Sequence, residues 1–151
     1  MKAVIESIGG VGSRAVIGGH ELVFDQPAAV PGGADRGPSP LDVMSVAVAA
    51  CAHYFAAAYL RARELSAQGL TVTVTAEKER TPVPRIGRVE LRVQLPAGLS
   101  ERHAAGVERA IKGCPAYGTL LHSPSVELSI ATGRDAPTDE VAPGGPVEMV
   151  G

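Results

Sequence analysis

The sequence predicts a single domain of the α+β class, and three observations carry this prediction. Short apolar runs punctuated by glycine occupy residues 4–24, an uncharged, alanine-rich stretch extends over residues 43–60, and strictly alternating segments follow at 70–75 and 88–95. Glycine-punctuated and alternating runs indicate antiparallel strands, whereas a long uncharged run without alternation indicates a buried helix. At 151 residues the chain is long enough to bury one substantial core.

The N-terminal part is expected to form two or three antiparallel strands between Val4 and Phe24. Residues 9–12 and 18–19 separate the apolar runs and are rich in glycine, which accepts the positive φ values of tight turns. Residues 26–38 are rich in proline and glycine and predict a loop.

A long helix is expected to begin at Ser39 and to run to about Ser66. Ser39 suits the N-cap, Pro40 the first helical position, and Asp42 the third, where it would close a capping box. Such a helix would be roughly 40 Å long. That exceeds the breadth of about 25 Å expected for one compact domain, so we expect the helix to kink or to extend into a partner subunit.

The second half of the chain predicts two strands, a helix and a last strand. Residues 88–95 place Val89, Leu91, Val93 and Leu95 on one face, with charged and polar side chains on the other, as in a sheet with one wet face. A helix is expected over residues 100–113, a short turn up to residue 121, and an alternating strand over residues 125–130. We expect one domain over residues 1–132 and a disordered tail over 133–151, because the tail is rich in proline, glycine and acids.

Composition excludes several classes of function. The formal net charge of −2 predicts no general attraction to nucleic acid or to anionic lipid. The stretch at 43–60 is long enough to span a membrane, but it is mostly alanine with polar side chains among it, so a buried helix is the better interpretation. Glu6 interrupts the N-terminal apolar run, which argues against a signal peptide and favours a cytoplasmic protein.

The two cysteines are the main chemical candidates. Cys51 lies in the middle of the predicted long helix, and Cys114 lies at a Gly-Cys-Pro junction where the second helix must end. Two thiols so far apart, with no other cysteine, suggest a redox pair rather than a disulfide scaffold. The alternative is structural, since a cysteine in an alanine-rich helix is commonly a small buried apolar residue, and Cys114 continues a core stripe with Val107 and Ile111.

Three features of the chain occur together. They are the segment Gly37-Pro38-Ser39-Pro40-Leu41-Asp42-Val43-Met44, which leads through Ala49-Ala50 to Cys51, the later pair Cys114-Pro115, and a final Val-x-Leu-x-Ile strand. With these features the chain resembles the OsmC/Ohr family. The family comprises organic hydroperoxide-handling proteins and their OsmC-like relatives. The resemblance covers roughly residues 1–132. It implies antiparallel sheets packed on a long central helix that carries a cysteine, in an intertwined homodimer whose sites lie at the interface.

By this resemblance Cys51 would attack an organic hydroperoxide, Cys114 would form a disulfide with it, and an external dithiol would reduce that disulfide. Arg14 is the nearest match to the family's activating arginine, with a solvated hairpin arginine as the alternative and Arg36 as a substitute. Leu41 stands where the peroxidases of the family carry glutamate. The OsmC-like branch is therefore favoured, and a non-catalytic dimer that binds a small apolar ligand at its interface is the alternative function.

The remaining candidates are assigned no catalytic role. His53 is two residues from Cys51 and points to another face of the helix, so a buried or interface histidine is expected. The four histidines show no metal spacing, so neither a zinc site nor a cofactor is predicted. An apolar lining of Met44, Val48, Phe55 and Tyr117 would suit a greasy peroxide.

Overall fold

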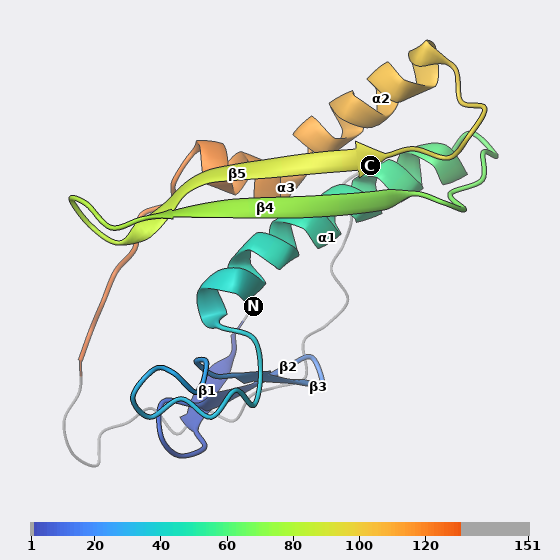
Figure 1. The fold of residues 1–151 in the computed structure, drawn as a ribbon. Helices are drawn as coiled ribbons and strands as arrows, with labels where there is room; N and C mark the ends of the chain where they lie inside the picture. Colours follow the sequence, from blue (N-terminus) through green and yellow to red (C-terminus); the bar gives the residue numbers. More distant parts are fainter. Residues whose placement is uncertain (1, 131–151) are drawn as a thin grey trace. The chain divides into compact units, whose positions relative to one another are not determined.

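A computed structural model describes residues 2–130, which form two compact units (Figure 1). The N-terminal unit comprises residues 2–40 with 127–130, and the cysteine unit comprises Leu41–Val126. The described chain contains two antiparallel sheets and three helices, so the α+β class predicted from the sequence is confirmed.

The sheet of the N-terminal unit is a three-stranded antiparallel meander. Its strands β1 (Val4–Ser7), β2 (Ser13–Ile17) and β3 (His20–Phe24) lie in sequence order, as the glycine pattern predicts. Gly18 and Gly19 join β2 to β3 with φ of 55° and 81°. Two positive φ values in a two-residue hairpin turn match the right-handed twist of the strands and strongly favour glycine.

A buried carboxylate holds the loop that follows β3. Asp25 is 1% exposed and accepts hydrogen bonds from the backbone N–H groups of Gln26 and Arg36 and from Arg36 Nε, the last at 2.8 Å. The hydrogen bond from the Arg36 side chain, opposed by burial and assisted by the two backbone donors, lowers the pKa of Asp25 to about 2. Arg36 Nη1 and Nη2 donate to the carbonyls of Ile8 and Gly9, which ties this loop to the β1–β2 turn.

The long helix α1 (Pro40–Arg61) starts at the predicted proline but ends about five residues earlier than predicted. Glu64 adopts a φ of 57°, a left-handed conformation that a helix cannot contain. At 22 residues, α1 is about 33 Å long. The predicted length of roughly 40 Å is therefore wrong, and the argument for a partner from helix length alone is correspondingly weaker.

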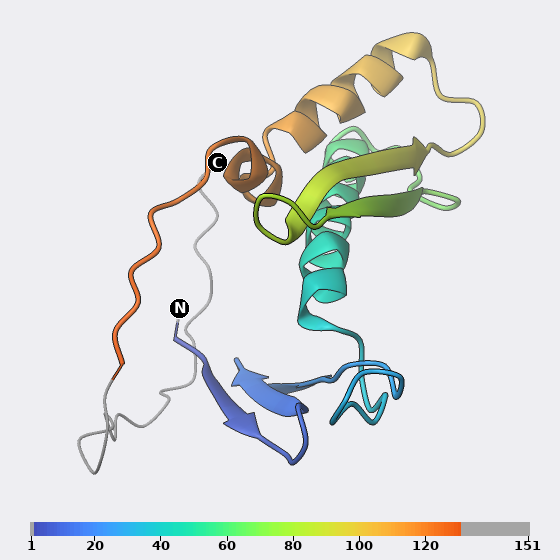
Figure 2. The ribbon, with the colours of Figure 1, turned by 60° about the vertical axis from the view of Figure 1, so that its left-hand side comes forward.

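The strands β4 (Thr71–Glu79) and β5 (Arg85–Gln94) form an antiparallel hairpin that lies along α1 (Figures 1 and 2). Both strands are longer than the alternating segments predict, but their inward faces are as expected. The buried core consists of apolar residues from α1, the segment before β4 and the next helix: Ala52, Ala56, Leu60, Leu70, Val107 and Ile111. Leu91, Val93 and Leu95 pack against this core.

Two helices follow the hairpin, α2 (Glu101–Lys112) and α3 (Pro115–Leu121). A Cβ atom at Gly106 of α2 would overlap the ring of Tyr59, so this glycine allows α1 and α2 to approach closely. The Tyr59 hydroxyl lies 3.4 Å from His103 Nδ1, and the Arg63 guanidinium lies 3.7 Å from the centre of the Tyr59 ring. These contacts fix the Tyr59 ring between the two helices.

The predicted last strand is not formed. Residues 125–130 have no regular secondary structure, and the side chains of Val126, Leu128 and Ile130 are 88%, 85% and 83% exposed. The alternating pattern was sound evidence of strand propensity, but a strand also needs a hydrogen-bonded neighbour. The predicted disordered tail, residues 133–151, lies outside the described residues.

By length and composition alone, α1 would be able to cross a membrane. A central helix of a soluble protein has the same properties, and α1 buries Val48, Ala52, Ala56 and Leu60 within the cysteine unit. The core interpretation of this segment is therefore retained.

Candidate functional site

The two cysteines, 63 positions apart in the sequence, meet in the cysteine unit. Cys51 lies on α1 and is half-buried, and Cys114 is 1% exposed at the start of α3. Both are free thiols, and the Cys51 thiol donates a hydrogen bond to the Cys114 sulfur. The two side chains are therefore close to each other, which is the first requirement for a disulfide, and their redox pairing stays a prediction.

The surroundings of Cys51 favour its protonated form. Burial is the main cause that raises the pKa of the Cys51 thiol, and the hydrogen bond to Cys114 raises it further. The backbone N–H of Ala116 donates a hydrogen bond to Cys51 and acts in the opposite direction. No cation is among the groups that shift this pKa in the described chain, so the lowering that a nucleophilic thiol needs is not supplied by these neighbours.

The local setting of Cys114 differs from the sequence-based expectation. Cys114 was expected at the C-terminal end of the second helix, but α2 ends at Lys112 with Gly113 as its C-cap, and Cys114 is the N-cap of α3. Pro115 occupies the first position of α3, where the absence of an N–H group costs nothing. The Gly-Cys-Pro sequence therefore ends one helix and starts another, which brings the Ala116 N–H to Cys51.

An apolar groove lies along the part of α1 that leads to Cys51. Its volume is about 780 Å³, and it is lined by apolar residues of α1 and α3 and by the first half of β5: Leu41, Met44, Val48, Tyr117, Leu120, Leu121 and residues 85–91. Val48 is one helical turn before Cys51, and Tyr117 is three residues after Cys114. Three of the four predicted lining residues are thus found in the groove, whereas Phe55 is not among its lining residues.

Arg14 lies in the N-terminal unit, at the centre of its sheet. Its guanidinium is 2.8 Å from Glu6 on β1 and 3.6 Å from Glu21 on β3, and both glutamates are exposed. The hydrogen bond from Arg14 to Glu6 and the charges of the two glutamates raise the pKa of Arg14. The two glutamates lie on the strands on either side of Arg14, and the sequence did not predict this arrangement.

Arg36 also belongs to the N-terminal unit, where it has a structural role. Its guanidinium donates to Asp25 and to the carbonyls of Ile8 and Gly9, and a Cβ atom at Gly12 would collide with it. These contacts engage all three guanidinium nitrogens. Arg14 is therefore the better of the two candidates for an arginine that acts on another group.

Two further observations concern residues that the sequence did not single out. Ala116 contributes a backbone donor to Cys51, and only the helix-start signal of Cys114-Pro115 would have suggested it. His53 is exposed on α1, so of the two expected settings burial within the chain is wrong, and a place at an interface stays a prediction.

The comparisons with solved structures show the same fold. A Psychrobacter arcticus 273-4 protein with a proposed role in osmotic stress and detoxification matches with a TM-score of 0.71 at 19% identity, over 79% of this chain and 87% of that one. The OsmC like protein from Mycoplasma pneumoniae matches with a TM-score of 0.67 at 20% identity, over 81% and 86%. An organic hydroperoxide resistance protein from Elizabethkingia anophelis matches with a TM-score of 0.59 at 21% identity, over 78% and 85%.

No curated protein matches the sequence. The model of the OsmC-like protein family matches residues 32–129, which include α1, the β4–β5 hairpin, α2, α3 and both cysteines. The chain therefore belongs to the OsmC-like protein family, whose members include redox and peroxide-stress proteins.

Proposed function

We propose that this protein reduces organic hydroperoxides with the Cys51–Cys114 pair. The observation that carries the proposal is the hydrogen bond between the two thiols. The groove of about 780 Å³ is lined by Val48, one helical turn before Cys51, and by Tyr117, three residues after Cys114. A partly exposed thiol in contact with a buried one suits a two-step reaction, in which the accessible sulfur meets the substrate and the buried sulfur completes the disulfide.

The reaction balances with two thiols and one peroxide. The Cys51 thiolate attacks the outer oxygen of R–O–O–H, the O–O bond breaks, and the leaving alkoxide takes up a proton to give ROH, while Cys51 becomes a sulfenic acid. The Cys114 sulfur then attacks the sulfenic sulfur, which releases water and forms the disulfide. An external dithiol, the proposed reductant, restores both thiols by exchange.

The first step requires a cation near Cys51, because burial and Cys114 raise the pKa of this thiol. Arg14 is the proposed source. Its side chain is 42% exposed, and Glu6 and Glu21 orient it on the sheet. In the peroxidases that the chain resembles, a glutamate at the position of Leu41 helps to position the arginine. Glu6 and Glu21 would do the same for Arg14.

The proposal includes a homodimer that works in the cytoplasm. Support for the dimer comes from apolar groups that the single chain leaves exposed, namely Val46 and Tyr54 on α1 and the last described segment with Val126, Leu128 and Ile130. A second copy would bury these side chains and thereby stabilise the assembly.

The proposal is tested with the reduced full-length protein, cumene hydroperoxide and a reagent that traps sulfenic acid. We expect the wild type to lose two hydrogens as it forms the Cys51–Cys114 disulfide. Cys114→Ser should instead accumulate the trapped adduct on Cys51. Cys51→Ser should neither reduce cumene hydroperoxide nor form an adduct with the trapping reagent. Arg14→Ala should slow the first step by raising the pKa of Cys51. Oxidation of wild-type Cys51 no faster than that of free cysteine would refute the peroxidase proposal.

The raised pKa of Cys51 and the presence of Leu41 favour a second candidate, a dimer that binds an apolar ligand without catalysis. In that case the groove along α1 would retain its ligand whether or not the cysteines are present. Equal binding of an apolar ligand by the wild type and by a Cys51→Ser variant, with no peroxide reduction by either, would establish this alternative.

A further inference from the structure

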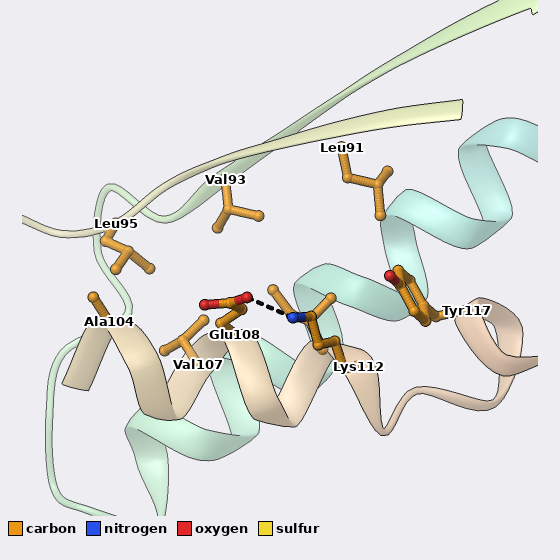
Figure 3. A pocket seen from close by; sticks show the side chains of 9 residues that line it. Leu91, Val93, Leu95, Ala104, Val107, Glu108, Lys112 and Tyr117 are labelled. Atoms are coloured by element: carbon orange, nitrogen blue, oxygen red, sulfur yellow. Dashed lines mark hydrogen bonds and ion pairs between the residues drawn. The ribbon is translucent and has the colours of Figure 1, made fainter. Parts of the chain in front are cut away.

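A second cleft lies on the other side of Tyr117, between β5 and α2 (Figure 3). Its volume is about 330 Å³, and its walls are apolar: Leu91 and Val93 on β5, with Leu95 directly after it, face Ala104, Val107 and Ile111 on α2. It is separate from the groove along α1, although Leu91 and Tyr117 border both.

The β5 wall of this cleft is incompletely sealed. Val107 and Ile111 are buried, but Leu91, Val93 and Leu95 are only half-buried although they point toward α2. Half-buried leucine and valine side chains on one wall of a cavity are stabilised when an apolar group fills it, because more apolar surface then leaves water.

Polar groups are confined to one side of the cleft. Lys112 Nζ lies 2.6 Å from Glu108 Oε1, and this exposed ion pair runs along α2 at the edge of the cleft. The Tyr117 ring stands at the end near Leu91, with its hydroxyl turned toward the cleft. The hydrogen bond to Glu108 and the charge of Glu108 raise the pKa of Lys112, and burial opposes them only weakly, so the lysine stays a cation in this setting.

We propose that this cleft binds a neutral single-chain amphiphile, a medium-chain primary alcohol. The hydroxyl would accept a hydrogen bond from Lys112 or Tyr117 and donate one to Glu108, while the alkyl chain would lie between β5 and α2 toward Leu95 and Ala104.

The size of the cleft sets the length of the chain. A cavity of about 150 Å³ holds benzene, so about 330 Å³ corresponds to roughly a dozen carbon atoms or fewer. The wall from Leu91 to Leu95 is four residues long on a strand, about 13 Å. An extended alkyl chain of eight to ten carbons, an estimate that follows from this volume and length, fits along it.

The ion pair sets the charge of the head group. Because Glu108 and Lys112 neutralise each other, a carboxylate head would meet repulsion from Glu108 as well as attraction from Lys112. A hydroxyl group is both donor and acceptor, so it satisfies both members of the pair without displacing either.

The test is a titration of the full-length protein with 1-octanol, followed by the NMR signals of its methyl groups. We expect saturable shifts at Leu91, Val93, Leu95 and Val107, and binding of octanoate that is at least several-fold weaker. Val93→Trp should fill the cleft and weaken octanol binding by tenfold or more. Arg92→Trp, one residue away on the opposite face of β5, is the matched control and should bind as the wild type does.

The head-group assignment has its own variant. Glu108→Gln removes the repulsion, so octanoate should bind as well as octanol or better. Ala104→Phe blocks the cleft from the α2 side and replaces Val93→Trp if that variant fails to fold. Three outcomes would overturn the proposal. They are NMR shifts centred on Met44 and Val48, octanol binding that neither blocking variant changes, and a ratio of octanol affinity to octanoate affinity that Glu108→Gln leaves unaltered.

Discussion

At the scale of single residues, the contact between Cys51 and Cys114 controls the acidity of Cys51. Because the Cys51 S–H donates to Cys114, removing the acceptor should lower the pKa of Cys51. We expect Cys114→Ala to show faster alkylation of Cys51 than the wild type at pH 7–8, with the midpoint of the rate profile moved to lower pH. A pH profile of alkylation by iodoacetamide measures this effect. An unchanged or higher midpoint would show that burial alone sets the pKa.

Asp25 predicts how the stability of the N-terminal unit depends on pH. Its pKa is lowered from 3.8 to about 2 in the folded protein. Above pH 3.8 the carboxylate is ionised in both states and stabilises the fold fully. As the pH falls toward 2, the unfolded state takes up a proton first and the stabilisation is lost. The protection of the β1–β3 amides against hydrogen exchange, measured relative to the unfolded chain at the same pH, should therefore fall over this range.

Asp25→Asn isolates the contribution of this carboxylate. The variant should exchange its β1–β3 amides faster at neutral pH and should lack the acid-dependent change between pH 3.8 and 2. Glu6→Gln is the control, since Glu6 is an exposed partner of Arg14 and should leave both properties nearly unaltered. An Asp25→Asn protein that retains the wild-type pH profile would show that another group is responsible.

At the scale of elements, the packing of α1 on α2 depends on Gly106. Alanine is normally preferred over glycine in a helix by up to about 1 kcal/mol. At position 106, however, a Cβ atom would overlap the Tyr59 ring. We therefore expect Gly106→Ala to lower the free energy of unfolding by about 1–3 kcal/mol, the usual cost of overpacking. Urea denaturation measures this change.

Gly118 in α3 provides the matched control. A Cβ atom there meets nothing within 4 Å, so Gly118→Ala should raise the free energy of unfolding by up to about 1 kcal/mol. Tyr59→Leu combined with Gly106→Ala should recover part of the loss. Equal effects of the two glycine substitutions would show that the α1–α2 approach is less tight than these contacts indicate.

The elements were predicted from the sequence to different extents, for physical reasons. The alternation at 70–75 and 88–95 and the start of α1 at Pro40 are local signals. They predicted α1's first residue and the existence of β4 and β5, although both strands extend beyond the alternating segments. The end of α1 was missed because residues 61–64 are adequate helix formers, whereas the chain closes the helix with a left-handed Glu64 and a hydrogen bond from the Leu65 N–H to the Leu60 carbonyl. The last strand was predicted from propensity alone, which cannot supply its missing neighbour.

The candidate site was predicted through the family resemblance rather than through local patterns. Nothing in the spacing of Cys51 and Cys114 requires contact between them, and the structure supplies that contact by ending α2 at Lys112 and starting α3 at Pro115. The Asp25–Arg36 pair and the cleft between β5 and α2 depend on approaches between distant segments, for which the sequence contains no periodic signal.

At the scale of the whole molecule, we expect a dimer of about twice the chain mass of 15.5 kDa. Val46 is 56% exposed on the uncharged face of α1, and burying such a side chain contributes about 1.5–3 kcal/mol. Val46→Arg should therefore weaken dimerisation by about tenfold or more. Light scattering over a range of protein concentrations measures this shift.

Val83→Arg is the control for charge and exposure, because Val83 is 64% exposed in the β4–β5 loop. This variant should remain dimeric. A wild-type protein that is monomeric at micromolar concentration would exclude the dimer, and equal dissociation of both variants would exclude the α1 face as its interface.

The deep burial of Cys114 also determines which sulfur an incoming reductant can reach. At 1% exposure Cys114 is closed to a molecule in solution, whereas Cys51 is partly exposed. In an oxidised protein with this arrangement, the attacking thiolate must therefore strike Cys51, so that Cys114 is the leaving group and the mixed disulfide forms on α1. The sulfur that the reductant attacks when the disulfide is reduced is thus set by the accessibility of the two sulfurs, independently of their acidities.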